Sequence, residues 1–129
     1  MAQTVLLFRL NQDKYAAVRK VCKILGIRIL DIARKDYSQK LGSLAQIQGF
    51  SKEAKKYDGS ELPAEMLVFS EMNSDQVDAF LAEYKKTGVE PIALKAVVTD
   101  QNIFWTADRM QKELLREHLF MSNTYKSNM

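Results

Sequence analysis

The hydrophobic and polar positions of this 129-residue chain follow two periods, one typical of strands and one typical of helices. Residues 4–10 (TVLLFRL) form an apolar run of strand length. Asn11 then predicts a helix N-cap, and Gly26 predicts the end of the helix. Residues 27–32 (IRILDI) alternate as a second strand does. Between the two caps the apolar positions recur at spacings of three and four, which predicts one helix face made of Tyr15, Val18, Val21, Cys22 and Leu25.

The same pattern returns later in the chain. Residues 66–69 (MLVF) predict a strand, and Asn73 with Gln76 has the spacing of a capping box at a helix start. Gly88 predicts the end of that helix, and residues 91–98 predict a fourth strand. The apolar face of this helix is Val77, Phe80, Leu81 and Tyr84.

The two patterns are related by a constant offset of 62 positions. Asn11 to Asn73 spans this offset, and so does Gly26 to Gly88. The spacing predicts an internal repeat with units at about 4–48 and 65–120.

Each β-α-β pattern is followed by a segment with helical periodicity, residues 38–48 in the first unit and 102–120 in the second. Residues 49–63 are polar and predict a loop, and residues 122–129 predict a polar, frayed tail. Since neither half is large enough to bury a good core alone, we expect residues 1–129 to form a single domain.

The element order β-α-β-α, twice, predicts an α+β fold. We expect a ferredoxin-like sandwich in which the two units interleave into an antiparallel sheet of strand order 4-1-3-2. The alternative is an α/β fold with a doubly wound parallel four-stranded sheet. Strands with one polar face favour the first, because a parallel sheet is apolar on both faces.

Composition narrows the class of protein. Hydrophobic residues make up 47% and charged residues 27%, which excludes a disordered or fibrous chain. No apolar stretch is long enough to span a membrane, and the N-terminus lacks the features of a secretory signal. One cysteine allows no internal disulfide, so we expect a cytoplasmic protein. The net charge of +3 is uneven, with eight basic and three acidic residues in 1–36 but seven and ten in 64–129.

The sequence predicts no catalytic residue, metal site or cofactor. One His and one Cys cannot form a His/Cys zinc site, and no phosphate-binding glycine motif is present. Cys22 falls on the apolar helix face and predicts an inert thiol, while His118 predicts a surface position. Whether the chain is an enzyme stays open.

Lys95 is the most informative single charge, because it interrupts the apolar run IALKAVV. Strand alternation places it opposite Leu94 and Ala96, on a face that we expect to be open. With Thr99, Asn102 and Trp105 it could line a site for an anionic ligand near the start of the last helix.

A second candidate surface is the basic side of the first helix. Ferredoxin-like sheets often bind single-stranded RNA, although this chain offers only one aromatic residue on each central strand. The residues of this alternative nucleic-acid site are Lys14, Arg19, Lys20 and Lys23.

Several motifs together resemble a family of small bacterial proteins classed only as a domain of unknown function. They include LGI at 25–27, Asp36-Tyr37, Leu41-Gly42, Gly49-Phe50, and LKAV at 94–97 with Thr99. The resemblance runs from about Thr4 to Glu117 and implies a bacterial cytoplasmic protein, but no reaction. Tyr37 and Gly42, within these motifs, join the candidate ligand-binding residues.

The sequence favours a non-enzymatic domain that binds a small anionic ligand or a protein partner, expected as a homodimer. A weak nucleic-acid-binding module is the first alternative. An enzyme that acts on an anionic substrate near Lys95 is the second.

Overall fold

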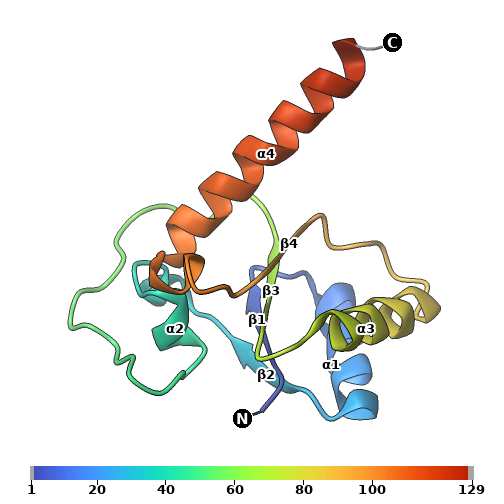
Figure 1. Ribbon diagram of the computed structural model, residues 1–129, viewed down its shortest axis with the longest axis horizontal. Helices are drawn as coiled ribbons and strands as arrows, with labels where there is room; N and C mark the ends of the chain where they lie inside the picture. The colour runs from blue at the N-terminus through green and yellow to red at the C-terminus, as the bar shows by residue number, and fades with distance from the viewer. Residues whose placement is uncertain (1, 128–129) are drawn as a thin grey trace.

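The computed structural model describes residues 2–127, with side chains described up to residue 117. Figure 1 shows the strands together in the centre of the molecule, with helices on both sides. The elements in chain order are β1 (Thr4–Phe8), α1 (Gln12–Leu25), β2 (Arg28–Asp31), the 3₁₀ turn η1 (Arg34–Asp36), α2 (Leu41–Leu44), β3 (Met66–Ser70), α3 (Ser74–Lys86), β4 (Leu94–Val97), the 3₁₀ turn η2 (Asn102–Phe104) and α4 (Ala107–Ser127).

The four strands form one open, mixed sheet of order β2-β1-β3-β4. β1 pairs with β2 in parallel, β3 pairs with β4 in parallel, and the two central strands β1 and β3 are antiparallel. The α+β class is therefore confirmed. The predicted strand order 4-1-3-2 is wrong, and the alternative of a parallel doubly wound sheet is wrong as well.

The physical reason lies in the burial of the central strands. All five residues of β1 and all five of β3 are buried. Such strands are covered on both faces, which suits a classical β-α-β unit with adjacent parallel strands. The two units therefore stand side by side and do not interleave, and only the β1–β3 junction is antiparallel.

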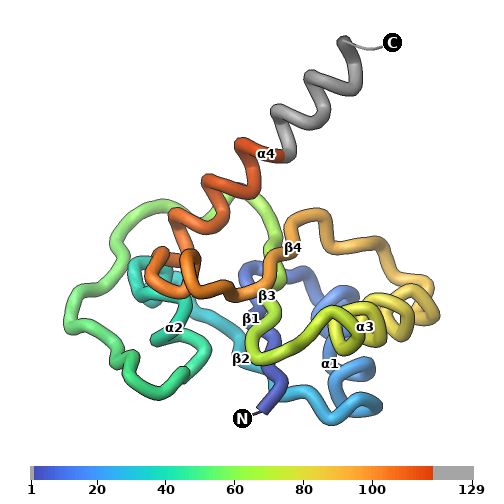
Figure 2. Tube along the Cα trace, in the orientation of Figure 1, coloured from blue at the N-terminus to red at the C-terminus, as the bar shows by residue number. Residues whose placement is uncertain are grey.

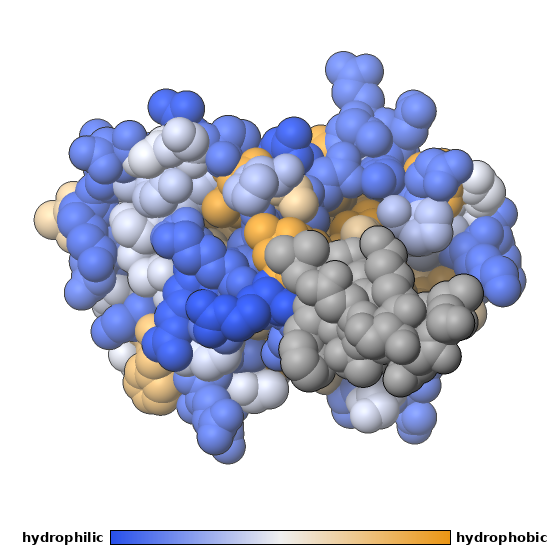
Figure 3. Space-filling view, turned by 90° about the horizontal axis from the view of Figure 1, so that it is seen from above, coloured by the Kyte–Doolittle hydropathy of each residue, from blue (hydrophilic) through white to orange (hydrophobic). Residues whose placement is uncertain are grey.

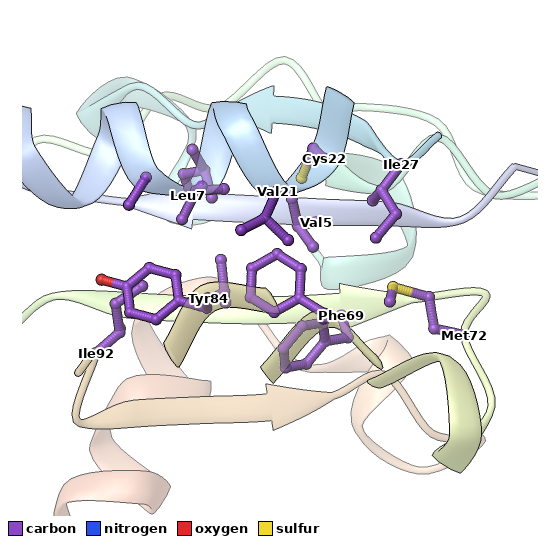
Figure 4. Close-up of a cluster of buried hydrophobic side chains, with 13 residues drawn as sticks. Val5, Leu7, Val21, Cys22, Ile27, Phe69, Met72, Tyr84 and Ile92 are labelled. Atoms are coloured by element: carbon purple, nitrogen blue, oxygen red, sulfur yellow. The ribbon is translucent and has the colours of Figure 1, made fainter. Parts of the chain in front are cut away.

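One face of the sheet is covered by α1 and α3. Val5, Leu7, Leu67 and Phe69 point from the central strands towards these helices and form one continuous hydrophobic cluster with them. Figure 4 shows this cluster between the layers, with Tyr84 and Ile92 at one end and Met72 at the other. Phe69 packs edge-on against Phe80 of α3, with ring centroids 5.2 Å apart.

The other face is covered by α2, the long loop and the start of α4. Leu6, Phe8, Met66 and Val68 point to this side and pack with residues from all three segments. In Figure 2 the loop of residues 49–63, in green, runs on the side of the molecule away from α1 and α3. Residues 49–63 contain no helix or strand, and Leu62 ties this segment into the core at 3% exposure.

The ends of α1 and α3 follow the prediction. The side chain of Asn11 accepts a hydrogen bond from the backbone N–H of Lys14, and Asn73 forms a full capping box with Gln76. Gly26 and Gly88 both adopt positive φ, at 71° and 74°, directly at the helix ends. These are conformations that glycine takes without steric cost.

The two helices that follow the β-α-β units differ from the prediction. Of residues 38–48 only one turn, α2, is helical, because Gln46 turns the chain at a positive φ of 60°. The helix expected from Asn102 begins as η2, breaks at an extended Trp105 and restarts as α4. α4 continues to Ser127, beyond the predicted end near residue 120, and the last two residues of the predicted frayed tail lie outside the described residues.

The capping box of α3 gives a direct test of this local account. Replacing Asn73 with Ala removes the acceptor for the Gln76 N–H, and we expect a loss of about 0.5–2 kcal/mol in the free energy of unfolding. Asn73→Asp keeps an acceptor at this position and serves as the control. Urea denaturation measures both, and an Ala variant as stable as the Asp variant would contradict the account.

Candidate functional site

A largely apolar cavity lies between α3 and the edge strand β4. Its volume is about 430 Å³, and it opens to solvent. The wall is mostly apolar and comes from α3, the segment after it, β3 and β4: Leu67, Phe80, Leu81, Tyr84, Lys85, Gly88, Val89, Pro91, Ile92 and Lys95. We call this cavity the α3–β4 pocket.

Two lysines are the only charged side chains that line the α3–β4 pocket. Lys85 is in the last turn of α3, and Lys95 is on β4. Neither lysine forms an ion pair with any side chain that the structure describes. An anion with an apolar body would therefore meet two unpaired positive charges and apolar walls.

Lys95 lies where strand alternation predicts. Leu94 is buried and Lys95 is exposed, as alternation predicts, but Lys95 is paired with Leu67 of β3 and so lies on the sheet face that α1 and α3 cover, not on an open face. Its Nζ donates a hydrogen bond to the backbone carbonyl of Ile92, which holds the ammonium group over the pocket. Partial burial lowers the pKa of Lys95 below its ordinary value, because water can no longer solvate the charge fully.

The floor of the pocket belongs to the core and is fixed by it. Tyr84 stacks on Phe80 with ring centroids 6.2 Å apart, and its hydroxyl donates to the carbonyl of Glu90 at 2.7 Å. Burial is the main cause that raises the pKa of Tyr84. This hydrogen bond ties the segment after Gly88 to α3, so the shape of the pocket is set before a ligand arrives.

Thr99 and Asn102 bind each other away from this pocket. The Thr99 N–H donates to Asn102 Oδ1 at 2.7 Å, and the Asn102 N–H donates to Thr99 Oγ1 at 3.1 Å. The Asn102 amide also donates to the carbonyl of Val97 at 2.9 Å. The pair therefore closes the turn after β4, and the cap of α4 is Thr106, whose Oγ1 accepts from the N–H of Arg109.

Trp105 and Tyr37 lie on the face of the sheet opposite Lys95. Trp105 packs against the cluster beneath α4, and the Arg109 guanidinium sits 4.4 Å from the centre of its ring. Tyr37 is 1% exposed and donates its hydroxyl to Glu61 Oε1. Burial and this hydrogen bond raise the pKa of Tyr37 above its usual range. The structure therefore does not bring these two residues and Lys95 into one cavity.

Gly42 lies in α2 beneath the ring of Phe50. A Cβ atom at this position would lie 2.6 Å from Phe50 Cδ1, closer than atoms can pack. Phe50 in turn contacts Phe104, with ring centroids 5.5 Å apart. The glycine therefore permits the close approach of an aromatic ring.

The basic residues of α1 do not form one free surface. Lys14 pairs with Glu65 at 2.7 Å and is largely buried by this contact. Arg19 lies over the ring of Tyr15 at 5.9 Å, while Lys20 and Lys23 are exposed. The alternative nucleic-acid site thus keeps three of its four predicted cations facing solvent.

The chain contains one cysteine and one histidine, Cys22 and His118, and the structure describes the side chain of Cys22 only. Cys22 is 2% exposed, and burial raises the pKa of its thiol to about 12, as expected of an inert core cysteine. The side chain of His118 lies outside the described residues.

No helix in the described part of the chain is apolar enough over a sufficient length to cross a bilayer.

Sequence reasoning missed most of the α3–β4 pocket. It singled out Lys95 but placed Leu81 on the core-facing side of its helix, whereas Leu81 is 36% exposed at the pocket. The sequence did contain a signal for the pocket. Val89, Pro91 and Ile92 are apolar, although they lie between α3 and β4 in a segment without regular structure. Their convergence with α3 depends on the tertiary fold.

The fold and the pocket define an α+β protein with an open, four-stranded mixed sheet and a preformed apolar cavity at one edge. Residues 65–121, which span β3, α3, β4 and much of α4, match the family model described as Domain of unknown function (DUF3783). The expected resemblance to an uncharacterised family is thereby confirmed for this part of the chain. No curated protein matches the chain. No solved structure matches it either.

The packing of Gly42 gives a second test. Glycine to alanine normally favours a helix by about 1 kcal/mol, but here the methyl group meets Phe50, and overpacking costs about 1–3 kcal/mol. We expect Gly42→Ala to lower the free energy of unfolding in the wild-type background.

In a Phe50→Ala background the clash is absent, and the same substitution should be neutral or stabilising. A double-mutant cycle by urea denaturation measures the difference. An equal cost of Gly42→Ala in both backgrounds would show that Phe50 is not the reason for the glycine.

Proposed function

We propose that this chain is a non-enzymatic ligand-binding domain whose ligand is a small amphipathic anion, held in the α3–β4 pocket with its anionic group at Lys95. The observation that carries the proposal is an apolar pocket whose only charged lining residues are two unpaired lysines. This refines the expectation of a small anionic ligand near Lys95.

The size and chemistry of the pocket support a small organic ligand. A volume of about 430 Å³ lies within the range of about 300–1,000 Å³ typical of ligand sites. Apolar walls favour a hydrocarbon or aromatic body, because its transfer from water is favourable in proportion to the area buried. Hydrophobic side chains are also visible in the recesses between hydrophilic ones on the face shown in Figure 3.

The charge on Lys95 supports an anionic head group. A partly desolvated ammonium with a single carbonyl partner keeps two N–H donors for a ligand. A carboxylate would satisfy these donors and supply the opposite charge that the pocket lacks. Charge-assisted hydrogen bonds of this kind are stronger than neutral ones.

The remaining functional expectations stay predictions. They are a bacterial cytoplasmic protein, a homodimer, an origin of the two β-α-β units by internal repetition, a nucleic-acid site on α1 and an enzyme at Lys95. The equal 62-residue offset of the two helix caps and of the two positive-φ glycines supports the repetition. None of the other expectations is supported by an observation as specific as the pocket.

Octanoate is a suitable probe, because it combines an eight-carbon body with one carboxylate. We expect the wild-type protein to bind it and Lys95→Met to bind it about tenfold more weakly, the loss typical of one charge-assisted hydrogen bond. Lys56→Met, which removes an exposed charge from the loop, is the matched control and should bind as the wild type does. Isothermal titration calorimetry measures all three.

The pH dependence gives a sharper reading of the same titration. A carboxylate prefers charged Lys95, so octanoate affinity should be constant over the pH range in which both octanoate and Lys95 are charged, and fall as the pH rises through the pKa of Lys95 in the free protein. Burial lowers that pKa, so the fall should begin below the pH expected of an ordinary lysine.

Two results would contradict the proposal. One is octanoate binding that Lys95→Met and Lys56→Met weaken equally, which would indicate nonspecific charge attraction. The other is octanamide, the neutral analogue, binding as tightly as octanoate, which would show that the anionic group contributes nothing.

A further inference from the structure

The strand β4 is an edge of the sheet, so one row of its backbone groups has no strand beside it. The N–H of Val98 donates to the carbonyl of Phe69 at 2.9 Å, which directs Val98 and Ala96 towards β3. In a parallel ladder the residues between them direct their backbone groups to the opposite side. Lys95 and Val97 therefore present their N–H and C=O groups to the free edge.

One end of this row is closed by a side chain. The Asn102 amide donates to the carbonyl of Val97 at 2.9 Å, and Asn102 Oδ1 accepts from the N–H of Thr99 at 2.7 Å. The Lys95 N–H, the Lys95 carbonyl and the Val97 N–H have no such partner in residues 2–117. Three backbone groups are thus available to an added strand.

Two cavities flank this row on the α3 side of the sheet. Lys95 lines the α3–β4 pocket, and Val97 lines a second cavity of about 520 Å³. We call the second one the Val97 cavity, and its lining residues are Met72, Asn73, Ser74, Val77, Asp78 and Val97. Figure 4 places Tyr84 and Ile92 of the pocket at the opposite end of the core from Met72. The two cavities therefore lie beside alternate residues of β4, the spacing of side chains on one face of an extended peptide.

The charges along this edge have a direction. Lys85 and Lys95 line the α3–β4 pocket, whereas Asp78 is the only charged residue among the described ones that line the Val97 cavity. A peptide antiparallel to β4 has its carboxyl end beside the two lysines and away from Asp78. In that orientation its last residue faces Lys95, and the residue two positions earlier faces Val97.

The other edge of the sheet, β2, does not offer the same combination. The N–H of Ile32 donates to the carbonyl of Leu7, so the backbone groups of Ile29 and Asp31 point to the free side. Asp31 is exposed and carries a negative charge, which would repel a carboxylate at this edge.

We propose that the chain binds the carboxyl-terminal end of an extended apolar peptide, which adds a strand antiparallel to β4. The terminal carboxylate lies at Lys85 and Lys95, and the N–H of the last peptide residue donates to the Lys95 carbonyl. The last side chain enters the α3–β4 pocket, and the side chain two positions earlier enters the Val97 cavity. Main-chain hydrogen bonds and pockets for alternate side chains are the basis of such strand addition. This inference rests on the proposed function, since it names the chemistry of the anion at Lys95.

The test uses the peptide acetyl-Val-Ser-Leu with a free carboxylate, titrated into the full chain by isothermal titration calorimetry. We expect saturable binding. Methylation of the leucine nitrogen removes the donor to the Lys95 carbonyl and should weaken binding at least about tenfold. Methylation of the serine nitrogen, which points away from β4 in this pairing, is the matched control and should leave the affinity unchanged.

Val97→Ser tests the second cavity. We expect it to weaken the peptide severalfold, because the valine of the peptide loses an apolar contact. Octanoate affinity should stay unchanged, because octanoate is held in the α3–β4 pocket. Ile24→Ser, which removes an exposed apolar side chain from α1, is the control and should bind both ligands as the wild type does.

The outcomes separate this inference from the proposed function. Binding of octanoate without saturable binding of the peptide would overturn strand addition and leave the proposed function standing, whereas failure of both ligands would overturn both. Equal losses on methylation of the two nitrogens would show that the peptide does not pair with β4. Amide chemical-shift changes confined to β2 would place the peptide at the other edge and overturn the inference as well.

Discussion

The antiparallel pairing of β1 with β3 is the interaction on which the rest of the structure depends. Thr4 to Phe8 face Ser70 to Met66 in continuous register, and all ten residues are buried. The pair joins the two β-α-β units and presents apolar side chains alternately to both faces of the sheet. Each hydrophobic cluster therefore contains residues from both halves of the chain.

This central pairing leaves β2 and β4 as the edges of the sheet, and the two edges differ. On β2, Arg28 donates to Gln46 Oε1 and to the carbonyl of Ala45, which ties that edge to the segment after α2. On β4, Lys95 and Val97 are exposed, and the segment between Gly88 and the strand is tied to α3 by the hydrogen bond from Tyr84 to Glu90. The α3–β4 pocket forms at this edge because α3 and β4 pack on the same core but leave open space between them.

Much of the local structure could be predicted from the sequence, because local signals decide it. Asn11, Asn73, Gly26 and Gly88 mark helix ends through their own hydrogen bonds and backbone freedom, and the structure confirms all four. The strand order could not be derived in the same way, because both candidate sheets contain the same β-α-β units. The runs TVLLF and MLVF did hold a clue, since unbroken apolar strands are typical of positions covered on both faces.

The candidate site was predictable only at Lys95, whose exposure follows from alternation along one strand. Its partners in the pocket come from α3 and from the segment after Gly88, which lie beside β4 only in the folded chain. The residues that sequence reasoning grouped with Lys95 are close to it in sequence or belong to shared motifs. The structure gives them other roles: Asn102 closes a turn, and Tyr37 fills the opposite core.

The most direct test of the account is chemical-shift mapping of octanoate on the ¹⁵N-labelled full chain. The account predicts that the amide signals of Leu81, Lys85, Gly88, Ile92 and Lys95 shift together and saturate with one dissociation constant. Shifts that instead cluster on α1, or that spread over the surface without saturation, would contradict the assignment of the α3–β4 pocket as the binding site.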